Sequence, residues 1–280
     1  MGGESGKELY AMSRPVKETT HKTRLNQKQL HLLKMTYKFR FVTASLLARY
    51  KGLSISALNY SLAILADSGY LGRKYGKNYR IFGKGAVYYL TPKSLALLKD
   101  LDHTDHNVLH AQYKNKTVGQ SFIDHNLDVF AAYLSLRGSY PDTFHIFTKS
   151  ELAPFEYFPE PRPDLYLNRI KPVAGRTREY MVEILPDTQF FVLKKRFQAL
   201  IEHFDSGEWE NAAETDYPTL LLVCPDAKTE RRVQELAVKT FDSTGIDDLV
   251  VLTTTLNTLK TSANPIIWSR VNESEKLIPL

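Results

Sequence analysis

The chain has 280 residues, of which 43% are hydrophobic and 24% are charged, and its net charge is +6. This composition is typical of a globular protein long enough for two modest domains, and it excludes an intrinsically disordered chain. No apolar run approaches the roughly 18 residues needed to cross a bilayer, and the polar first residues show no secretory signal. Cys224 is the sole cysteine. We therefore expect a cytoplasmic protein, away from membranes, with no intrachain disulfide and no cysteine-rich zinc site.

The charge is unevenly distributed along the chain. Residues 1–100 contain 18 Lys and Arg against 5 Asp and Glu, a net charge of +13, whereas residues 101–280 have a net charge of −7. A basic segment joined to an acidic one is typical of a protein in which one domain binds a polyanion and the other does not. The alternative is a solvated basic face without a ligand.

The first 100 residues predict an arm followed by short helices. Residues 1–25 are polar and contain several glycines, so we expect a flexible arm. Three helices are predicted after it, over residues 27–38, 43–50 and 54–68. In the third helix Leu58, Leu62 and Leu65 repeat at helical spacing, and Gly69 follows as a terminating residue.

A basic hairpin is predicted next. Residues 70–71 and 87–91 favour strands, and the loop between them interleaves glycines with Lys and Arg. Pro92 then begins a further helix, to residue 99. Three helices followed by a basic hairpin is the arrangement of a winged helix-turn-helix, and the hairpin strands resemble the wing-flanking strands of bacterial winged-helix proteins. We assign this domain to residues 26–100.

The winged helix predicts binding to double-stranded DNA. Its third helix fits the major groove, and Ser56, Asn59 and Tyr60 lie off the leucine face as candidate base-reading residues. Phosphate contacts are expected from the hairpin residues Arg73, Lys74, Lys77, Asn78, Arg80 and Lys84. The alternative is a winged helix that mediates only protein contacts.

The remainder of the chain predicts a second domain of α/β class. Residues 101–117 are polar and are expected to be a linker, and residues 118–280 the second domain. Helices are predicted over 118–137, 190–204 and 229–241, and strands over 143–148, 164–170, 179–185, 219–224 and 248–253. The uniformly apolar strand 219–224 favours a central position with both faces buried.

The order of elements in residues 118–224 resembles the core of PD-(D/E)xK nuclease-like domains. This resemblance implies that Asp164, at the second strand, and Glu183, on the third, hold a divalent metal such as Mg²⁺ or Mn²⁺, which activates water. The active pattern has a lysine two residues after the glutamate, where this chain has Leu185. Lys194 or Lys195, on the following helix, are the candidates to replace it.

Three interpretations of the two carboxylates stay open. They belong to a degenerate nuclease fold, to an active metal-dependent nuclease, or to an unrelated α/β domain in which they are plain surface or strand-end carboxylates. The missing lysine favours the degenerate fold, because an attacking water needs a nearby cation as well as a metal.

A closer resemblance covers most of the chain. The winged helix, the segments 124–127 and 162–167, and Val182-Glu183 followed by Thr188 and a basic helix resemble the replication-relaxation family of plasmids and other mobile elements. The segment 185–187 departs from the more acidic, glycine-containing stretch expected in that family. The resemblance implies a role in plasmid replication, or in DNA relaxation at a transfer origin.

The function predicted from these patterns is that of a non-catalytic DNA-binding accessory factor in replication, relaxation or mobilisation of a plasmid-like element, with no cofactor required. One alternative is a metal-dependent DNA endonuclease or nickase, and another is a dimeric transcriptional repressor. The expected partners are double-stranded DNA, a relaxase or replication protein, and a second copy of the chain in a homodimer.

Overall fold

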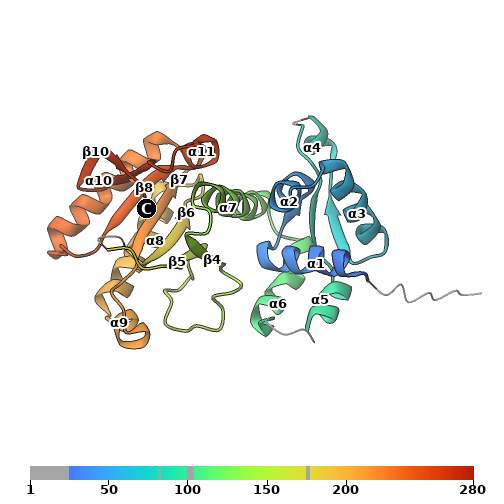
Figure 1. Ribbon diagram of the computed structural model, residues 1–280, viewed down its shortest axis with the longest axis horizontal. Helices are drawn as coiled ribbons and strands as arrows, with labels where there is room; N and C mark the ends of the chain where they lie inside the picture. The colour runs from blue at the N-terminus through green and yellow to red at the C-terminus, as the bar shows by residue number, and fades with distance from the viewer. Residues whose placement is uncertain (1–24, 82, 100–103, 175–176) are drawn as a thin grey trace, which may run out of the picture.

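The computed structural model describes residues 25–81, 83–99, 104–174 and 177–280, without the side chains of Lys77, Asn78, Ser274 and Glu275. Apart from its last residue, the predicted arm, 1–25, lies outside the described residues. The described strands form one three-stranded and one seven-stranded sheet, and helix α7 (Gln120–Ser139) lies between them (Figure 1). We call residues 25–99 the N-terminal part and residues 120–280 the C-terminal part. No described helix is long and apolar enough to span a membrane.

The N-terminal part combines short helices with a small antiparallel sheet. Its helices are α1 (Gln27–Phe39), α2 (Ala44–Lys51), α3 (Ile55–Asp67), α4 (Lys77–Ile81) and α5 (Pro92–Lys99). Its strands are β1 (Val42–Thr43), β2 (Leu71–Lys74) and β3 (Val87–Leu90), paired in the order β1-β3-β2. The three helices predicted before the hairpin are confirmed to within a residue or two at their ends.

Side-chain caps explain where α2 and α3 begin. The Thr43 hydroxyl accepts a hydrogen bond from the Leu46 amide at 3.3 Å, and the Ser54 hydroxyl accepts one from the Ala57 amide at 3.2 Å. Each cap pairs an amide that the first helical turn leaves without a backbone partner. The turn between the two helices passes through Gly52, whose φ of 65° lies in the left-handed region that glycine tolerates.

Two segments differ from the elements predicted for them. The hairpin loop contains α4, where a simple turn was expected. The segment expected to be a linker, 101–117, contains α6 (His106–Gln112) and the 3₁₀ helix η1 (Tyr113–Lys116). The side chain of Asp105 caps α6, and Leu109 is buried in the core of the N-terminal part, so this polar segment has a buried side that its composition conceals.

The C-terminal part is a mixed α/β layer structure. Its further helices are α8 (Phe190–Asp205), α9 (Glu208–Ala213), α10 (Ala227–Thr244) and α11 (Leu256–Thr261). Its strands are β4 (Phe144–Thr148), β5 (Leu165–Arg169), β6 (Glu179–Ile184), β7 (Thr219–Cys224), β8 (Val251–Thr255), β9 (Trp268–Arg270) and β10 (Glu273–Ile278). The sheet order is β10-β9-β8-β7-β6-β5-β4, and β6, β7 and β8 are parallel to one another.

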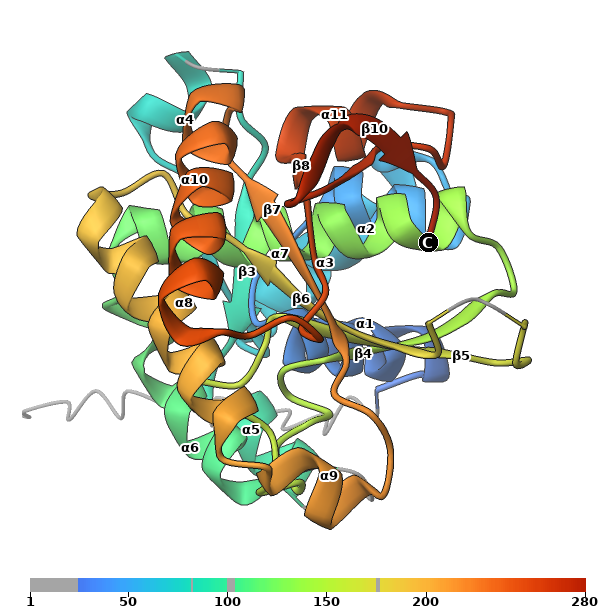
Figure 2. The same ribbon diagram turned by 90° about the vertical axis from the view of Figure 1, so that its left-hand side faces the viewer.

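Both faces of this sheet are covered by helices, which explains the apolar strands at its centre. Helices α7 and α11 cover one face and α8 and α10 the other (Figure 2). Along β7, Leu221 and Val223 pack toward α7, whereas Leu220 and Leu222 pack toward α8. Every residue of β7 is buried, so the predicted central strand with two buried faces is confirmed.

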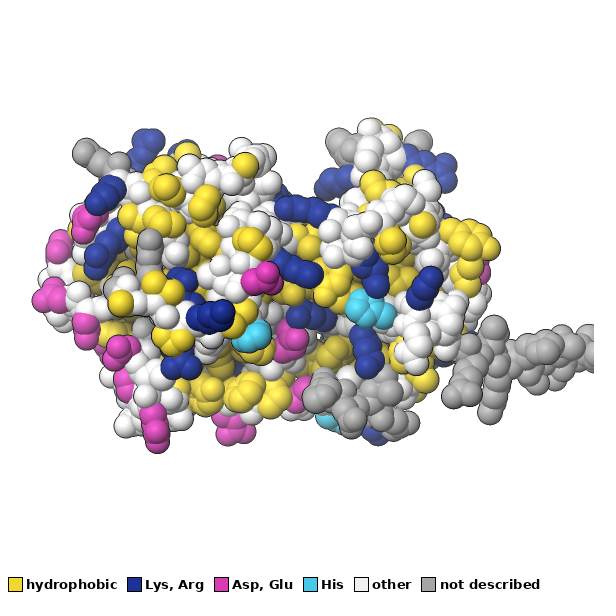
Figure 3. All heavy atoms as spheres, in the orientation of Figure 1, with side chains coloured by type: hydrophobic (Ala, Val, Ile, Leu, Met, Phe, Trp, Pro, Cys, Tyr) yellow, Lys and Arg dark blue, Asp and Glu magenta, His cyan; other side chains and the backbone are white. Residues whose placement is uncertain are grey.

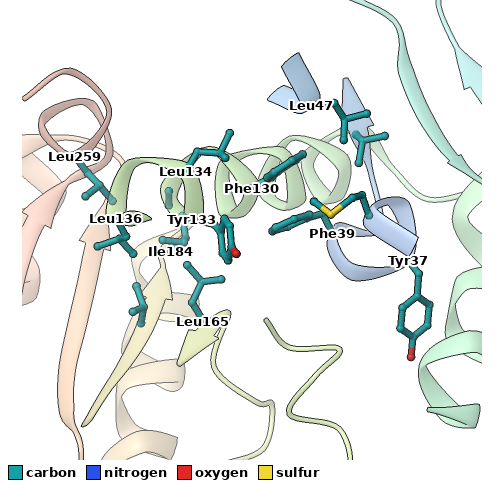
Figure 4. Packing of buried hydrophobic residues seen from close by; sticks show 14 of the residues in the cluster. Tyr37, Phe39, Leu47, Phe130, Tyr133, Leu134, Leu136, Leu165, Ile184 and Leu259 are labelled. Atoms are coloured by element: carbon teal, nitrogen blue, oxygen red, sulfur yellow. The ribbon is translucent and has the colours of Figure 1, made fainter. Parts of the chain in front are cut away.

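One continuous hydrophobic core joins the two parts through α7. Phe39 at the end of α1 stacks on Phe130 of α7, with ring centroids 3.8 Å apart, and Tyr133 packs edge-on against Phe39. The same cluster extends along α7 to Leu165 and Ile184 of the large sheet (Figure 4). The helix therefore belongs to the packing of both sheets rather than to one of them alone.

Candidate functional site

The outer face of α3 carries the predicted base-reading residues. Leu58, Leu62 and Leu65 are buried, and the helical period therefore leaves Ser56, Asn59 and Tyr60 on the solvent side. All three of these polar side chains are exposed, and 72% of the surface of Tyr60 is accessible. This face is free to contact a ligand in the described structure.

Two arginines of the hairpin are held on a tyrosine. The guanidinium carbons of Arg73, on β2, and Arg80, on α4, lie 5.0 and 5.3 Å from the ring centroid of Tyr75. Both arginines are exposed. Cation–π contacts of this kind restrict long side chains and so hold two positive charges near each other at the hairpin tip. The predicted phosphate-contacting side chains of Lys77 and Asn78 lie outside the described residues.

The other two predicted lysines of the hairpin contact the segment that begins α7. The Lys74 ammonium donates to the Val118 carbonyl at 3.2 Å, and the Lys84 ammonium lies 3.9 Å from a carboxylate oxygen of Asp124. The Tyr79 hydroxyl donates to the side chain of Gln120 at 2.8 Å in the same region. The Lys84 pair is largely exposed, so it contributes little stability and leaves the lysine able to exchange partners.

Asp164 is buried immediately before β5, and both of its carboxylate oxygens have protein partners. One oxygen lies 3.1 Å from Nε2 of His125 on α7, and the other accepts the Ile184 amide at 2.9 Å. Burial raises the pKa of Asp164, but the hydrogen bond and charge of His125 outweigh that effect, so the pKa lies below its ordinary value. Burial lowers the pKa of His125, and Asp164 raises it by more. The pair therefore favours the charged forms of both groups.

Glu183 of β6 is paired with Arg196 of α8. The Nε of Arg196 donates to one carboxylate oxygen at 3.0 Å, and its Nη2 donates to the other. The side chains of Glu183 and Arg196 are only 8% and 13% exposed. Burial raises the pKa of Glu183 above its ordinary value, although the guanidinium opposes that shift. Two parallel hydrogen bonds of this type also fix the orientation of both side chains.

This geometry does not fit the divalent metal that the nuclease resemblance implies. Each oxygen of Asp164 and Glu183 already has a hydrogen-bond partner from His125, Arg196 or the backbone. Among the residues that the structure describes, no group of three or more His, Cys, Asp or Glu side chains is arranged to hold a metal. A cation is present beside the glutamate, but it is the guanidinium of Arg196.

The lysines predicted to complete the site lie at different places around it. Lys195 lines a cavity of about 620 Å³ together with Asp164, Glu183 and Arg196, whereas Lys194 is exposed and is not part of that lining. Leu185, at the position of the missing lysine, is buried. Lys149, which directly follows β4, lines the same cavity.

Arg196 was not predicted from the sequence, which gives only a partial signal for it. Lys194, Lys195 and Arg196 are consecutive, and the buried residues of α8 on either side are Leu193 and Phe197. Successive helical residues are 100° apart, so Lys195 projects away from the buried face, whereas Lys194 and Arg196 lie at its two edges at similar angles. A helical projection of this basic run therefore excludes Lys195 but does not distinguish Arg196 from Lys194.

A second cavity, of about 400 Å³, lies on the N-terminal side of the His125–Asp164 pair. The two cavities share Phe122, His125, Lys149, Arg162 and Asp164. Arg162 stabilises the loop after β4, because its guanidinium donates hydrogen bonds to the carbonyls of Leu152 and Ala153 at 3.2 and 3.1 Å. The segment Arg162-Pro163-Asp164 therefore holds a loop and a histidine in place.

Comparison with known proteins gives one match. The model of the replication-relaxation family matches residues 33–143, which extend from within α1 to the residue before β4. This match confirms the family resemblance predicted from the sequence. It includes the small sheet, the hairpin, α6 and α7, and it ends before Asp164 and Glu183. No curated protein and no solved structure gives a significant match to the chain.

Proposed function

We propose that this protein, which resembles the replication-relaxation family over residues 33–143, is a DNA-binding accessory factor in the replication, relaxation or mobilisation of a plasmid-like element. In this proposal α1 to α3 and the β2–β3 hairpin act as a winged helix on double-stranded DNA. The C-terminal part acts as a nuclease-like scaffold that does not cleave. A relaxase or replication protein as partner, a homodimer and a cytoplasmic location remain predictions.

The observation that carries the DNA-binding proposal is the combination of an open α3 with a basic hairpin. Apart from α4 in the hairpin loop, the order α1-β1-α2-α3-β2-β3 and the antiparallel pairing of β3 with both β1 and β2 are the arrangement expected of a winged helix. The solvent face of α3 is open for a groove, and Arg73 and Arg80 lie on the hairpin that would meet the phosphates beside it.

The distribution of charge supports the same assignment. Residues 25–99 contain 13 Lys and Arg and a single acidic residue, Asp67. Figure 3 shows Lys and Arg atoms over α4 and toward α7, whereas Asp and Glu atoms gather along the outer edge of the C-terminal part. A polyanion would therefore be attracted to the N-terminal part and directed away from the acidic helix α9, which carries Glu208 and Glu210.

The pairing of Glu183 with Arg196 supports the non-catalytic role. Hydrolysis of a phosphodiester by a metal site needs free carboxylate oxygens for the ion and a cation or base that can orient water. Here the carboxylate oxygens bind an arginine, a histidine and a backbone amide. These groups can maintain the fold without performing chemistry.

Two assays on the full chain test the proposal. Binding to a duplex of about 30 base pairs should weaken by roughly 10³-fold between 50 and 200 mM salt if about six phosphates are contacted. Supercoiled plasmid incubated with Mg²⁺ or Mn²⁺ should be neither nicked nor cut, and Asp164→Asn and Glu183→Gln variants should bind DNA as the wild type does. Absence of salt-dependent binding contradicts the DNA-binding proposal. Metal-dependent nicking that Glu183→Gln abolishes supports a nuclease instead.

A further inference from the structure

The exposed surface of α3 carries no positive charge, in contrast to the basic hairpin that follows it. The helix reads ISALNYSLAILAD, and it contains no Lys or Arg; its single charged residue is Asp67, at its C-terminal end. The exposed side chains of its first two turns are therefore those of Ile55, Ser56, Ala57, Asn59 and Tyr60. The cations that follow it in sequence belong to other elements, such as Arg73 and Arg80 of the hairpin.

Apolar side chains at the start of α3 are exposed without a role in the core. Leu53, in the turn before the helix, and Ile55, its first residue, are each 52% exposed. The leucines on the opposite side, Leu58 and Leu62, are 3% and 0% exposed, so the core of the N-terminal part is complete without the two exposed residues. A single exposed apolar residue needs no explanation, but here two of them adjoin the start of α3, and Ile55 lies one turn before Asn59 on the face proposed to enter a groove.

The chemistry of these side chains is selective among base pairs. Guanine is most often recognised by Arg or Lys, which donate to its O6 and N7, and α3 offers neither. Asn can form two hydrogen bonds with adenine, and an apolar side chain can pack on the methyl group of thymine. We propose that α3 recognises A·T base pairs in the major groove, with Asn59 bonded to adenine and Ile55 packed on a thymine methyl.

This inference rests on the proposed function, and it adds that the DNA sequence recognised consists of A·T base pairs. Duplex DNA is the favoured occupant of the apolar face because of the charge around it: Arg73 and Arg80 lie on the neighbouring hairpin, and residues 25–99 carry one acidic side chain. An apolar contact area on a protein partner would not require this excess of positive charge. The following experiment tests duplex DNA against a protein as the occupant of this face.

The experiment begins with selection of duplexes from a random pool by the full chain, followed by measurement of dissociation constants. The selected core should consist of A·T pairs. Replacing the contacted thymine by uracil removes one methyl group without altering base pairing, and should weaken binding about fourfold. Ile55→Ala should abolish the difference between thymine and uracil. Asn59→Ala should reduce the preference for A·T over G·C by roughly 5- to 160-fold.

Ile266→Ala provides the matched control, because Ile266 is an exposed isoleucine, 44% accessible, in the C-terminal part. It should retain the full thymine preference. Duplex binding with a G·C core, or with no base preference, overturns this inference and leaves the proposed function standing. Complete absence of duplex binding overturns both, and leaves a protein as the alternative occupant of the apolar face of α3. A thymine preference that Ile266→Ala removes as strongly as Ile55→Ala also overturns the assignment of Ile55.

Discussion

Two buried ion pairs attach α7 and α8 to the centre of the large sheet. His125 reaches Asp164 from α7, and Arg196 reaches Glu183 from α8. A buried pair is not in itself a strong source of stability, because desolvation opposes the attraction of the charges. Removing one partner is costly, however, since the other charge then remains buried without compensation. Each of the four residues therefore needs its partner, although the intact pairs add little to the stability of the fold.

The Glu183–Arg196 pair predicts a large loss of stability when the arginine is removed. Arg196→Ala should lower the free energy of unfolding by about 3–5 kcal/mol, because it leaves a buried carboxylate without its partner. The double variant with Glu183→Gln should recover a large part of that loss. Urea denaturation at pH 7 measures both, and Lys195→Ala, at the exposed neighbouring position, should change stability by less than about 0.5 kcal/mol. An Arg196→Ala protein as stable as the wild type would show that the carboxylate is already neutral.

The His125–Asp164 pair predicts a dependence on pH. The lowered pKa of Asp164 contributes stability above its ordinary value of 3.8, and that contribution is lost as the pH falls. The raised pKa of His125 contributes stability below its ordinary value of 6.5, and that contribution is lost as the pH rises through the raised pKa. The destabilisation caused by His125→Gln should therefore be larger at pH 5.5 than at pH 8.5 in urea denaturation. An equal loss at both pH values would contradict the charged pair, and the exposed His145 supplies the control substitution.

The β2–β3 hairpin is the element on which the DNA-binding proposal depends most. Tyr89 of β3 lies across Gly72 of β2, and a Cβ at position 72 would overlap its ring, so the close approach requires glycine there. The ring of Tyr75, which follows β2, makes cation–π contacts with Arg73 and Arg80. The Lys74 ammonium donates a hydrogen bond to the segment before α7. These contacts hold the hairpin in place, and its tip carries positive charge.

The prediction for this element concerns the salt dependence of binding. Arg73→Ala combined with Arg80→Ala should weaken binding to all duplexes alike and reduce the slope of log K against log salt by about two, because each phosphate contact releases about one counterion. Lys228→Ala combined with Arg231→Ala, two exposed positions on α10, should leave the slope unchanged. Fluorescence anisotropy over a salt series measures it. A double variant with the wild-type slope would place the phosphate contacts elsewhere.

The whole molecule is organised around α7, which contributes to the packing of both sheets. Phe130 is fully buried against Phe39 of α1, and Leu134 and Leu136, one turn further along, pack among residues of the large sheet. A core that continues across two parts couples their stability, because neither part can unfold without exposing apolar surface of the other.

This shared core predicts one cooperative unfolding transition. Both tryptophans, Trp209 and Trp268, are buried in the C-terminal part, so their fluorescence reports that part, whereas far-UV circular dichroism reports the helices of both. The two signals should give the same midpoint in urea. Phe130→Ala should lower the stability by about 3–5 kcal/mol and keep the midpoints equal. Two separate midpoints in the wild type would show that the parts unfold independently.

Sequence patterns predicted the long helices and the central strands, which depend on local periodicity, but they did not predict α4, α6, α9, α11, β9 or β10. The leucine spacing of α3 and the apolar run of β7 act within a few neighbouring residues, so their outcomes could be predicted before any packing was known. The family resemblance was also predicted from the sequence alone, and it is confirmed over residues 33–143. The segment with α6 escaped prediction because a short helix with one buried leucine has too little periodic signal.

The partners of Asp164 and Glu183 were decided only by the tertiary structure. The sequence identified both carboxylates, but His125 precedes Asp164 by 39 positions and Arg196 follows Glu183 by 13. Which basic side chain reaches a buried carboxylate depends on how α7 and α8 lie across the sheet, and no local pattern carries that information. For the same reason the sequence could assign Lys74 and Lys84 to a basic hairpin, but only the packing of that hairpin brought them to the start of α7. Local physics determined the elements of this protein, and the contacts between distant elements determined what its charged side chains are able to do.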